Sequence, residues 1–204
     1  MPSITLTYFD AAGRAEPARL AFFIGGVEFE DKRVGFPEFM EMKPTLPYGQ
    51  LPVLEVDGVT YAQSSAIVRY AGKISGLYPE DNLAALKVDE IVSSVDDFNN
   101  LLGPSMREKD PEKKKAMREA MLDGPLVVVM GNMEKQLKAN PGDWFVGDSI
   151  TIADLVANIP AKILLAGQVD HIPPSTLDAF PALKAHAEVV SKHPKVVEYY
   201  ASKK

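Results

Sequence analysis

The chain contains no cysteine, and it has a single tryptophan among its 204 residues. The absence of cysteine excludes disulfide bonds, thiolate metal sites and any thiol nucleophile supplied by the protein itself. A reducing compartment fits this composition, and no signal pattern precedes Ile4. No apolar run approaches the length of a membrane-spanning segment. We therefore expect a soluble, cytoplasmic protein.

Positive charge is also scarce. The chain has 22 lysines and arginines but 28 aspartates and glutamates, which gives a net charge of −6. This balance argues against nucleic acids and anionic membranes as partners. Hydrophobic residues make up 46% of the chain and charged residues 25%, as in ordinary globular proteins. The length suits one large domain or two small ones.

The first part of the chain mixes strand and helix patterns. Apolar spacing predicts a strand over 4–9, a helix over 14–24 and a strand over 27–34. Three prolines within 35–49 indicate a surface loop with one short helical turn around 39–42. A hairpin with Asp57-Gly58 at its turn follows, and it leads into a helix.

After residues 76–82, only helical patterns remain. Helices are expected over 83–102, where Gly103-Pro104 ends the pattern, and over 111–138, with a bend at Gly124-Pro125. Further helices are expected over 152–165, 177–191 and 195 to the end. Thr151 and Asp154 predict a capping box. The sequence thus predicts two domains, an α/β domain over 1–79 and an all-helical domain over 80–204.

Pro52 lies at the start of a predicted strand, where it cannot donate a backbone hydrogen bond. This position implies either an edge strand or a cis Leu51–Pro52 bond. A cis bond would turn the Leu51 amide and carbonyl outward, ready to pair with a peptide-like ligand. Ser64 and Ser65 lie at a helix start that could hold a carboxylate. The alternative is an ordinary edge hairpin followed by a capped helix.

Seven segments of the chain match a known family: Leu6–Phe9, Gly13–Glu16, Leu51–Gly58, Gln63-Ser64, Val88–Ile91, Asp96–Phe98 and Thr151–Asp154. With these segments, an α/β domain that carries this hairpin and is followed by an all-helical domain resembles the glutathione transferases, and within them the sigma class. The resemblance covers essentially the whole chain. It implies a thioredoxin-like N-terminal domain, a homodimer, glutathione as co-substrate, no permanently bound cofactor and no metal.

The resemblance implies that Tyr8 donates a hydrogen bond to the sulfur of glutathione and that Arg14 adds positive charge nearby. The thiolate is the nucleophile, and a thiol with a pKa of about 8.5 is mostly protonated at neutral pH. Lowering that pKa by about 2 units requires about 3 kcal/mol of preference for the anion. From the residues alone, Tyr8 is more often a core or rim side chain, and Arg14 could instead pair with Glu16.

The same resemblance implies how the rest of glutathione is held. The Leu51 backbone beside Pro52 would pair with the cysteinyl moiety. Gln63 and Ser64 would hold the γ-glutamyl carboxylate.

The glycyl end of glutathione would be reached by Lys43 and Gln50. Phe39 stands where this class often has a tryptophan, so an indole contact with the glycyl carboxylate is lost and weaker binding is expected. Asp97 of the partner subunit would meet the γ-glutamyl ammonium, which would make the homodimer the active unit.

Candidates for the wall of the electrophile pocket are Phe9, Arg14 and Met106, although Met106 could equally be a core residue packed between helices.

Two differences from the family pattern count against prostaglandin synthesis. Pro104 replaces a tryptophan that lines the second substrate's pocket in the vertebrate prostaglandin synthases, and Ser93 replaces an acid of their cation site.

The expected function is conjugation of the glutathione thiolate to hydrophobic electrophiles. One alternative is a glutathione-dependent, prostaglandin-type isomerase. Another is a non-catalytic relative, either crystallin-like or a ligand carrier, which the presence of Tyr8, Arg14, Gln63 and Ser64 disfavours. A thiol reductase is excluded because the chain has no cysteine.

Overall fold

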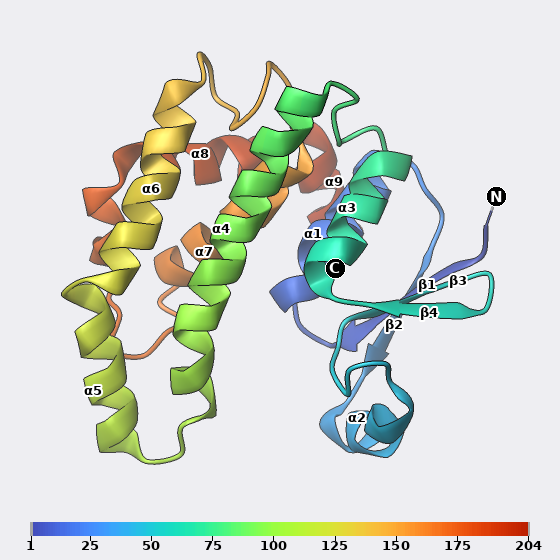
Figure 1. Cartoon of the computed structure of the whole chain (residues 1–204), viewed down its shortest axis with the longest axis horizontal. Coiled ribbons are helices and arrows are strands. Elements are labelled where there is room, and N and C mark those ends of the chain that lie inside the picture. Colours follow the sequence, from blue (N-terminus) through green and yellow to red (C-terminus); the bar gives the residue numbers. More distant parts are fainter. Residues whose placement is uncertain (1, 204) are drawn as a thin grey trace. The chain divides into compact units, whose positions relative to one another are not determined.

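A computed structural model describes residues 2–203 (Figure 1). The chain forms two compact units, the first built from residues up to Pro79 together with the segment from Pro194 onward, and the second from Glu80–His193. The last helix, which the sequence assigned to the helical domain, packs in the first unit instead.

The first unit contains a four-stranded mixed sheet with the strand order β2-β1-β3-β4. It has a thioredoxin-like architecture. Strand β1 (Ile4–Phe9) pairs in parallel with β2 (Glu30–Val34) and antiparallel with β3 (Val53–Val56), which pairs antiparallel with β4 (Val59–Ala62). The central position of β1 explains why Leu6 is fully buried.

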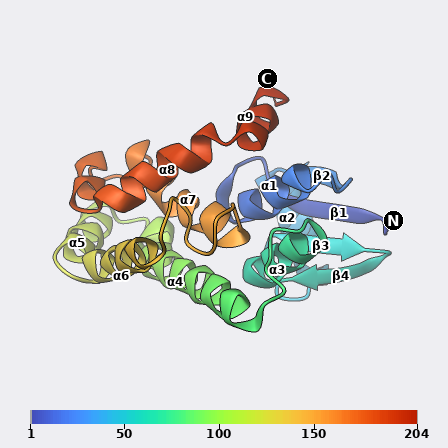
Figure 2. The same ribbon diagram turned by 90° about the horizontal axis from the view of Figure 1, so that it is seen from above.

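Within residues 2–203, four α-helices belong to the same unit as this sheet. Helix α1 (Glu16–Ile24) packs against α3 (Ser64–Ile74), and the two lie along the sheet (Figure 1). Helix α9 (Pro194–Ala201) lies beside α1 (Figure 2), where the Phe23 and Tyr199 ring centroids are 5.4 Å apart. Tyr199 is buried at this contact, while Phe23 is half-buried, and the packing of Tyr199 explains why the last helix belongs to the first unit.

Two segments of the first unit differ from the sequence prediction. Strand β2 begins at Glu30 rather than at residue 27, because the Val27 N–H donates back to the Phe22 carbonyl at 2.9 Å instead of joining the sheet. The short helical turn predicted around 39–42 is part of a longer helix α2 (Phe36–Met42), which is followed by a 3₁₀ turn over Lys43–Thr45. Pro37 lies in the first turn of α2, where a proline needs no N–H partner and favours a helix start.

The second unit is helical throughout. It contains α4 (Asn82–Arg107), α5 (Pro111–Leu122), α6 (Pro125–Ala139), α7 (Ile152–Leu165) and α8 (Pro181–Lys192), with a 3₁₀ turn over Pro174–Ala179 before α8. Helix α7 packs against α4 and α8. The helix predicted over 111–138 is interrupted at Gly124 and forms the separate helices α5 and α6.

Helix α4 does not end at Gly103-Pro104 as predicted, but continues to Arg107. A proline removes one backbone donor, and here the loss falls within the last turns of the helix. The Ser105 hydroxyl donates to the Leu102 carbonyl at 2.9 Å in the same turn. The predicted helix from residue 177 also differs, since Leu177 lies in the 3₁₀ turn and α8 begins at Pro181.

The predicted capping box at the start of α7 is confirmed. Thr151 Oγ1 accepts from the Ala153 N–H at 3.2 Å, and Asp154 Oδ2 accepts from the Thr151 N–H at 2.7 Å. Asp154 Oδ1 accepts from the Phe145 N–H at 2.9 Å and lies 3.0 Å from His186 Nε2. The fully buried Asp154 therefore links the start of α7 to a preceding loop and to α8. Across residues 2–203, every helix is too short or too polar to cross a membrane.

Candidate functional site

Tyr8 lies near the end of β1, and its side chain is half-buried. The Arg14 backbone N–H donates to the Tyr8 hydroxyl oxygen at 3.3 Å. A hydroxyl that accepts one hydrogen bond keeps its own proton to donate elsewhere. The Tyr8 ring lies edge-on to Phe9, with the ring centroids 5.4 Å apart. The phenol is thus held by the turn that carries Arg14.

Gly13 lies so close to the Tyr8 hydroxyl that a residue with a side chain would not fit at position 13. A Cβ atom at Gly13 would lie 2.6 Å from Tyr8 Oη and 2.8 Å from Tyr8 Cε1. The φ angle of Gly13 is +45°, in the left-handed region that favours glycine. The sequence indicated Gly13 only as the first residue of the matching segment Gly13–Glu16. Its packing against Tyr8 depends on how β1 and the turn fold back on each other, and no local pattern encodes this.

Replacing Gly13 by alanine is expected to displace the Tyr8 ring, because the added Cβ has no room beside it. We expect conjugation turnover to fall about tenfold through loss of a well-placed hydrogen bond, while retention on immobilised glutathione persists. Steady-state kinetics of Gly13→Ala measures the effect.

Gly26→Ala is the matched control. Gly26 also has a positive φ, of +66°, but a Cβ there would meet nothing within 4 Å. Both variants therefore carry backbone strain, and only Gly13→Ala carries the clash. Equal losses of turnover in the two variants would show that strain alone is responsible.

A narrow recess lies next to Arg14 in the first unit. It gathers six of the predicted site residues from three parts of the chain, and Tyr48 and Ala62 complete its wall. The Leu51–Pro52 bond is cis, which is one of the two alternatives that the sequence left open. The predicted residues in the recess are Arg14, Gln50, Leu51, Pro52, Gln63 and Ser64.

Gln63 has a positive φ of +77° and immediately precedes helix α3. Its carbonyl accepts from the N–H groups of Ala66 and Ile67, both at 2.9 Å. Non-glycine residues in such conformations cost about 1–3 kcal/mol and cluster at functional sites. This geometry places Gln63 and Ser64 at the positive end of α3, where a carboxylate would be favoured.

Phe39 and Lys43 belong to the neighbouring α2 region and do not line the recess itself. Phe39 packs edge-on against Phe9, with the ring centroids 5.2 Å apart. The Lys43 ammonium lies 5.8 Å from the centroid of the Phe39 ring, and its aliphatic carbons lie 3.7 Å from where a Gly49 Cβ would be. Lys43 therefore lies beside the segment that leads into Gln50.

Asp97 and Met106 both lie on α4, in the second unit. Asp97 is exposed. Met106 is 56% exposed, and its sulfur accepts from Arg118 Nη2 at 3.2 Å. Their roles toward glutathione and the electrophile stay predictions.

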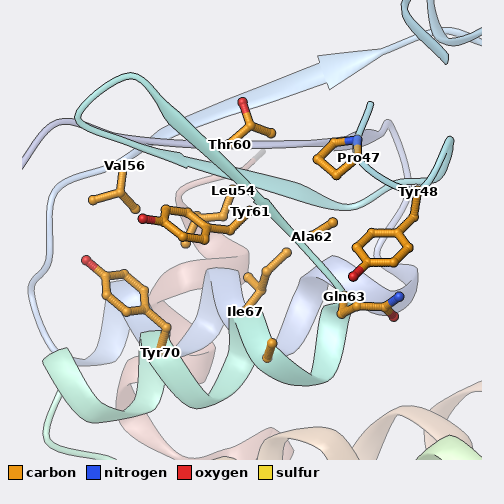
Figure 3. A pocket seen from close by; sticks show the side chains of 11 residues that line it. Pro47, Tyr48, Leu54, Val56, Thr60, Tyr61, Ala62, Gln63, Ile67 and Tyr70 are labelled. Atoms are coloured by element: carbon orange, nitrogen blue, oxygen red, sulfur yellow. The ribbon is translucent and has the colours of Figure 1, made fainter. Parts of the chain in front are cut away.

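A second, larger hollow of about 630 Å³ lies between β4 and α3 (Figure 3). Tyr61 of β4 and Tyr70 of α3 lie at one end, and Tyr48 lies near Gln63 at the other. Tyr48 and Tyr61 are 64% and 53% exposed. The hollow is thus a surface depression with an aromatic rim.

Comparison with known proteins shows the family to which the chain belongs. Residues 4–73 match the family model described as glutathione S-transferase, N-terminal domain, and residues 96–203 match the corresponding C-terminal domain. The chain belongs to the glutathione S-transferase family. Glutathione conjugation is thereby supported at the level of the family.

Individual relatives cover nearly the whole chain. Glutathione S-transferase 1 of Ascaris suum is 34% identical, covering 100% of this chain and 98% of its own. S-crystallin SL11 of Nototodarus sloanii is also 34% identical, covering 98% and 96%. The solved structure of prostaglandin synthase D of Nilaparvata lugens matches with a TM-score of 0.88 at 29% identity, covering 100% and 99%.

Proposed function

We propose that this chain conjugates glutathione to hydrophobic electrophiles and that the Tyr8 hydroxyl stabilises the thiolate. The observation that carries the proposal is the Tyr8 hydroxyl, held by the Arg14 N–H at 3.3 Å while its own proton stays available to donate. A preorganised donor aimed at an anion is a strong catalytic device, because it needs no reorganisation during the reaction. Arg14 would add positive charge near the sulfur.

The recess would hold the tripeptide itself. The Leu51 backbone would pair with the cysteinyl unit, while Gln63, Ser64 and the start of α3 would take the γ-glutamyl carboxylate. Lys43 and Gln50 would reach the glycyl carboxylate. The gathering of most of these groups around one recess supports this placement.

The electrophile would meet the sulfur beside Phe9 and Arg14, and Met106 of the second unit stays a prediction from the resemblance for the wall of its pocket. Phe9 offers an aromatic surface within 5.4 Å of the Tyr8 ring, measured between centroids. Methionine adapts its shape to varied apolar ligands, which suits Met106 to this role.

Retention on glutathione-agarose and conjugation of 1-chloro-2,4-dinitrobenzene test binding and chemistry separately. The wild-type chain should be retained, eluted by free glutathione and active. Retention without any conjugation would instead favour the carrier or crystallin-like alternative, and absence of both would reject the proposal. Conversion of a lipid endoperoxide is the corresponding assay for the isomerase alternative, which Pro104 and Ser93 make less favourable.

We also propose a sigma-class homodimer located in the cytoplasm. Tyr48 and Tyr61, which are exposed at the rim of the hollow in Figure 3, support association, because aromatic residues are enriched at protein interfaces. The absence of cysteine fits a reducing compartment. Sedimentation equilibrium tests the dimer, and cell fractionation tests the location.

Asp97 is expected to act across this dimer, and a complementation experiment tests that role. Chains carrying Tyr8→Phe and chains carrying Asp97→Ala are co-expressed with different tags, and the doubly tagged hybrid is purified. If Asp97 serves the partner's site, the hybrid contains one site with both wild-type groups, so activity with a wild-type KM for glutathione returns. A hybrid no better than the two parents would place Asp97 in its own subunit's site or in none.

A further inference from the structure

Arg19 is a fully buried arginine on helix α1, and sequence reasoning did not single it out. It lies in the otherwise apolar run from Ala18 to Ile24. Buried arginines need partners for most of their five N–H groups, because an unpaired buried charge is costly. The partners that Arg19 has found therefore show what it holds in place.

Three of these partners are backbone carbonyls of the turn between Tyr8 and Arg14. Arg19 Nη1 donates to the Ala11 carbonyl at 2.7 Å and to the Ala12 carbonyl at 3.4 Å. Arg19 Nη2 donates to the Phe9 carbonyl at 3.5 Å. One guanidinium thus fixes the path of the chain that joins the two proposed catalytic side chains.

The same guanidinium lies against the phenol. Its central carbon is 5.7 Å from the centroid of the Tyr8 ring, within the range of a cation–π contact. Arg19 therefore contacts both the ring of Tyr8 and the turn whose Arg14 N–H reaches the Tyr8 hydroxyl.

Two carboxylates balance the charge of Arg19. Glu16 Oε2 accepts from Nη1 at 3.2 Å, and Asp31 Oδ1 accepts from Nε at 2.8 Å. Asp31 Oδ2 in turn accepts from Arg33 and from Lys203. Burial alone would raise the pKa of Asp31, but hydrogen bonds from Lys203, Arg19 and Arg33 hold it below its usual value. Asp31 therefore stays ionised and anchors the guanidinium.

We infer that Arg19 is a positioning residue for the reaction, which sets the Tyr8 hydroxyl and the Arg14 turn in the geometry that favours the thiolate. The inference rests on the proposed function of Tyr8. Arg19 would touch neither glutathione nor the electrophile. Its effect would pass through the carbonyls of Phe9 and Ala11 and through the face of the Tyr8 ring.

Arg19→Lys is the principal test. Lysine keeps the charge, but its single ammonium cannot reach carbonyls and carboxylates spread around a planar guanidinium. We expect a folded protein that is still retained on glutathione-agarose. The apparent pKa of the bound glutathione thiol, measured from thiolate absorbance in the ultraviolet, should rise by about one unit. The pH profile of kcat/KM should move by the same amount. At a pH below the thiol pKa of both the wild type and the variant, the variant should be about tenfold less active.

Lys203→Met is the control for a general disturbance of the ion cluster. It removes a hydrogen bond to the same Asp31 carboxylate, but Lys203 makes no hydrogen bond to the turn over residues 9–13 among the contacts of the described chain. Its pH profile should match that of the wild type. A folded Arg19→Lys protein with a wild-type pH profile would overturn the inference and leave Arg19 a purely structural role.

Asp31→Asn covers the case in which Arg19→Lys does not fold, which circular dichroism would reveal. This variant keeps Arg19 but weakens its anchor, so a smaller upward shift of the thiol pKa is expected. An unshifted profile in folded Asp31→Asn would then overturn the inference. Failure of the proposed function is distinguishable, because in that case the wild-type protein itself would neither bind nor conjugate glutathione.

Discussion

Replacing Tyr8 by phenylalanine is expected to lower the conjugation of 1-chloro-2,4-dinitrobenzene by about 10- to 100-fold at neutral pH. A hydrogen bond to a charged group contributes about 1.5–3 kcal/mol, and each 1.36 kcal/mol of barrier is worth about tenfold in rate. The substitution removes only the hydroxyl, so the ring keeps its edge-on contact with Phe9. Retention on glutathione-agarose should persist, because the recess does not use the hydroxyl to hold the peptide.

Tyr61→Phe is the matched control for Tyr8→Phe. Tyr61 lies on β4 and is 53% exposed, so removal of its hydroxyl should leave turnover unchanged. Stopped-flow or steady-state assays on both variants compare them directly. A Tyr8→Phe protein that conjugates as fast as the wild type would show that another donor stabilises the thiolate.

Replacing Asp154 by alanine is expected to destabilise the protein by about 3–5 kcal/mol. The side chain is fully buried and accepts from the N–H groups of Phe145 and Thr151 and from the Thr151 hydroxyl. Each buried donor left without a partner costs about 1–3 kcal/mol, and His186 loses its neighbour as well. For a chain of this size, thermal unfolding should shift downward by roughly 6–20 °C.

Asp148→Ala provides the comparison for Asp154→Ala. Asp148 is an exposed residue of the loop before α7, and such substitutions usually change stability by less than about 0.5 kcal/mol. Thermal and urea unfolding of both variants, followed by circular dichroism, measure the difference. A shift for Asp154→Ala as small as that for Asp148→Ala would contradict the importance assigned to the capping carboxylate.

The sequence predicted best those features that depend on neighbouring residues. Asp57 and Gly58 both adopt positive φ angles in the hairpin turn, as the aspartate–glycine pair indicates. The capping box at Thr151 and Asp154 is likewise a matter of residues three apart. In each case the residues that decide the conformation are also the residues that adopt it.

The prediction that relied on proline as a helix breaker was wrong at Pro104, which lies in the last turns of α4, where it costs little. Pro37, which counted toward a loop, lies in the first turn of α2, where it favours the helix. The effect of a proline depends on its position in the finished helix. The presence of a proline therefore does not by itself show where a helix ends, unless the ends of that helix are already known.

The residues of the candidate site likewise fall into two groups, those that could be predicted from the sequence and those that depend on the finished fold. Tyr8 and Gln63 were predicted because the resemblance to a family supplies them, whereas Ser64 was already indicated by its place at a helix start. Gly13 and Arg19 gain their roles from contacts that form only after β1, the following turn and α1 have packed together. The one available signal for Arg19 was a charged residue within an apolar stretch of helix.

The return of α9 to the first unit has a practical consequence for dissecting the protein. A fragment ending at residue 79 would include the whole sheet, yet it would lack Tyr199, which packs on Phe23, and Lys203, which bonds to Asp31. Such a truncated piece would expose an aromatic and ionic surface that the full chain covers with its own terminus. A minimal form of the first unit would therefore have to keep α9, joined to α3 by a linker in place of the residues between them.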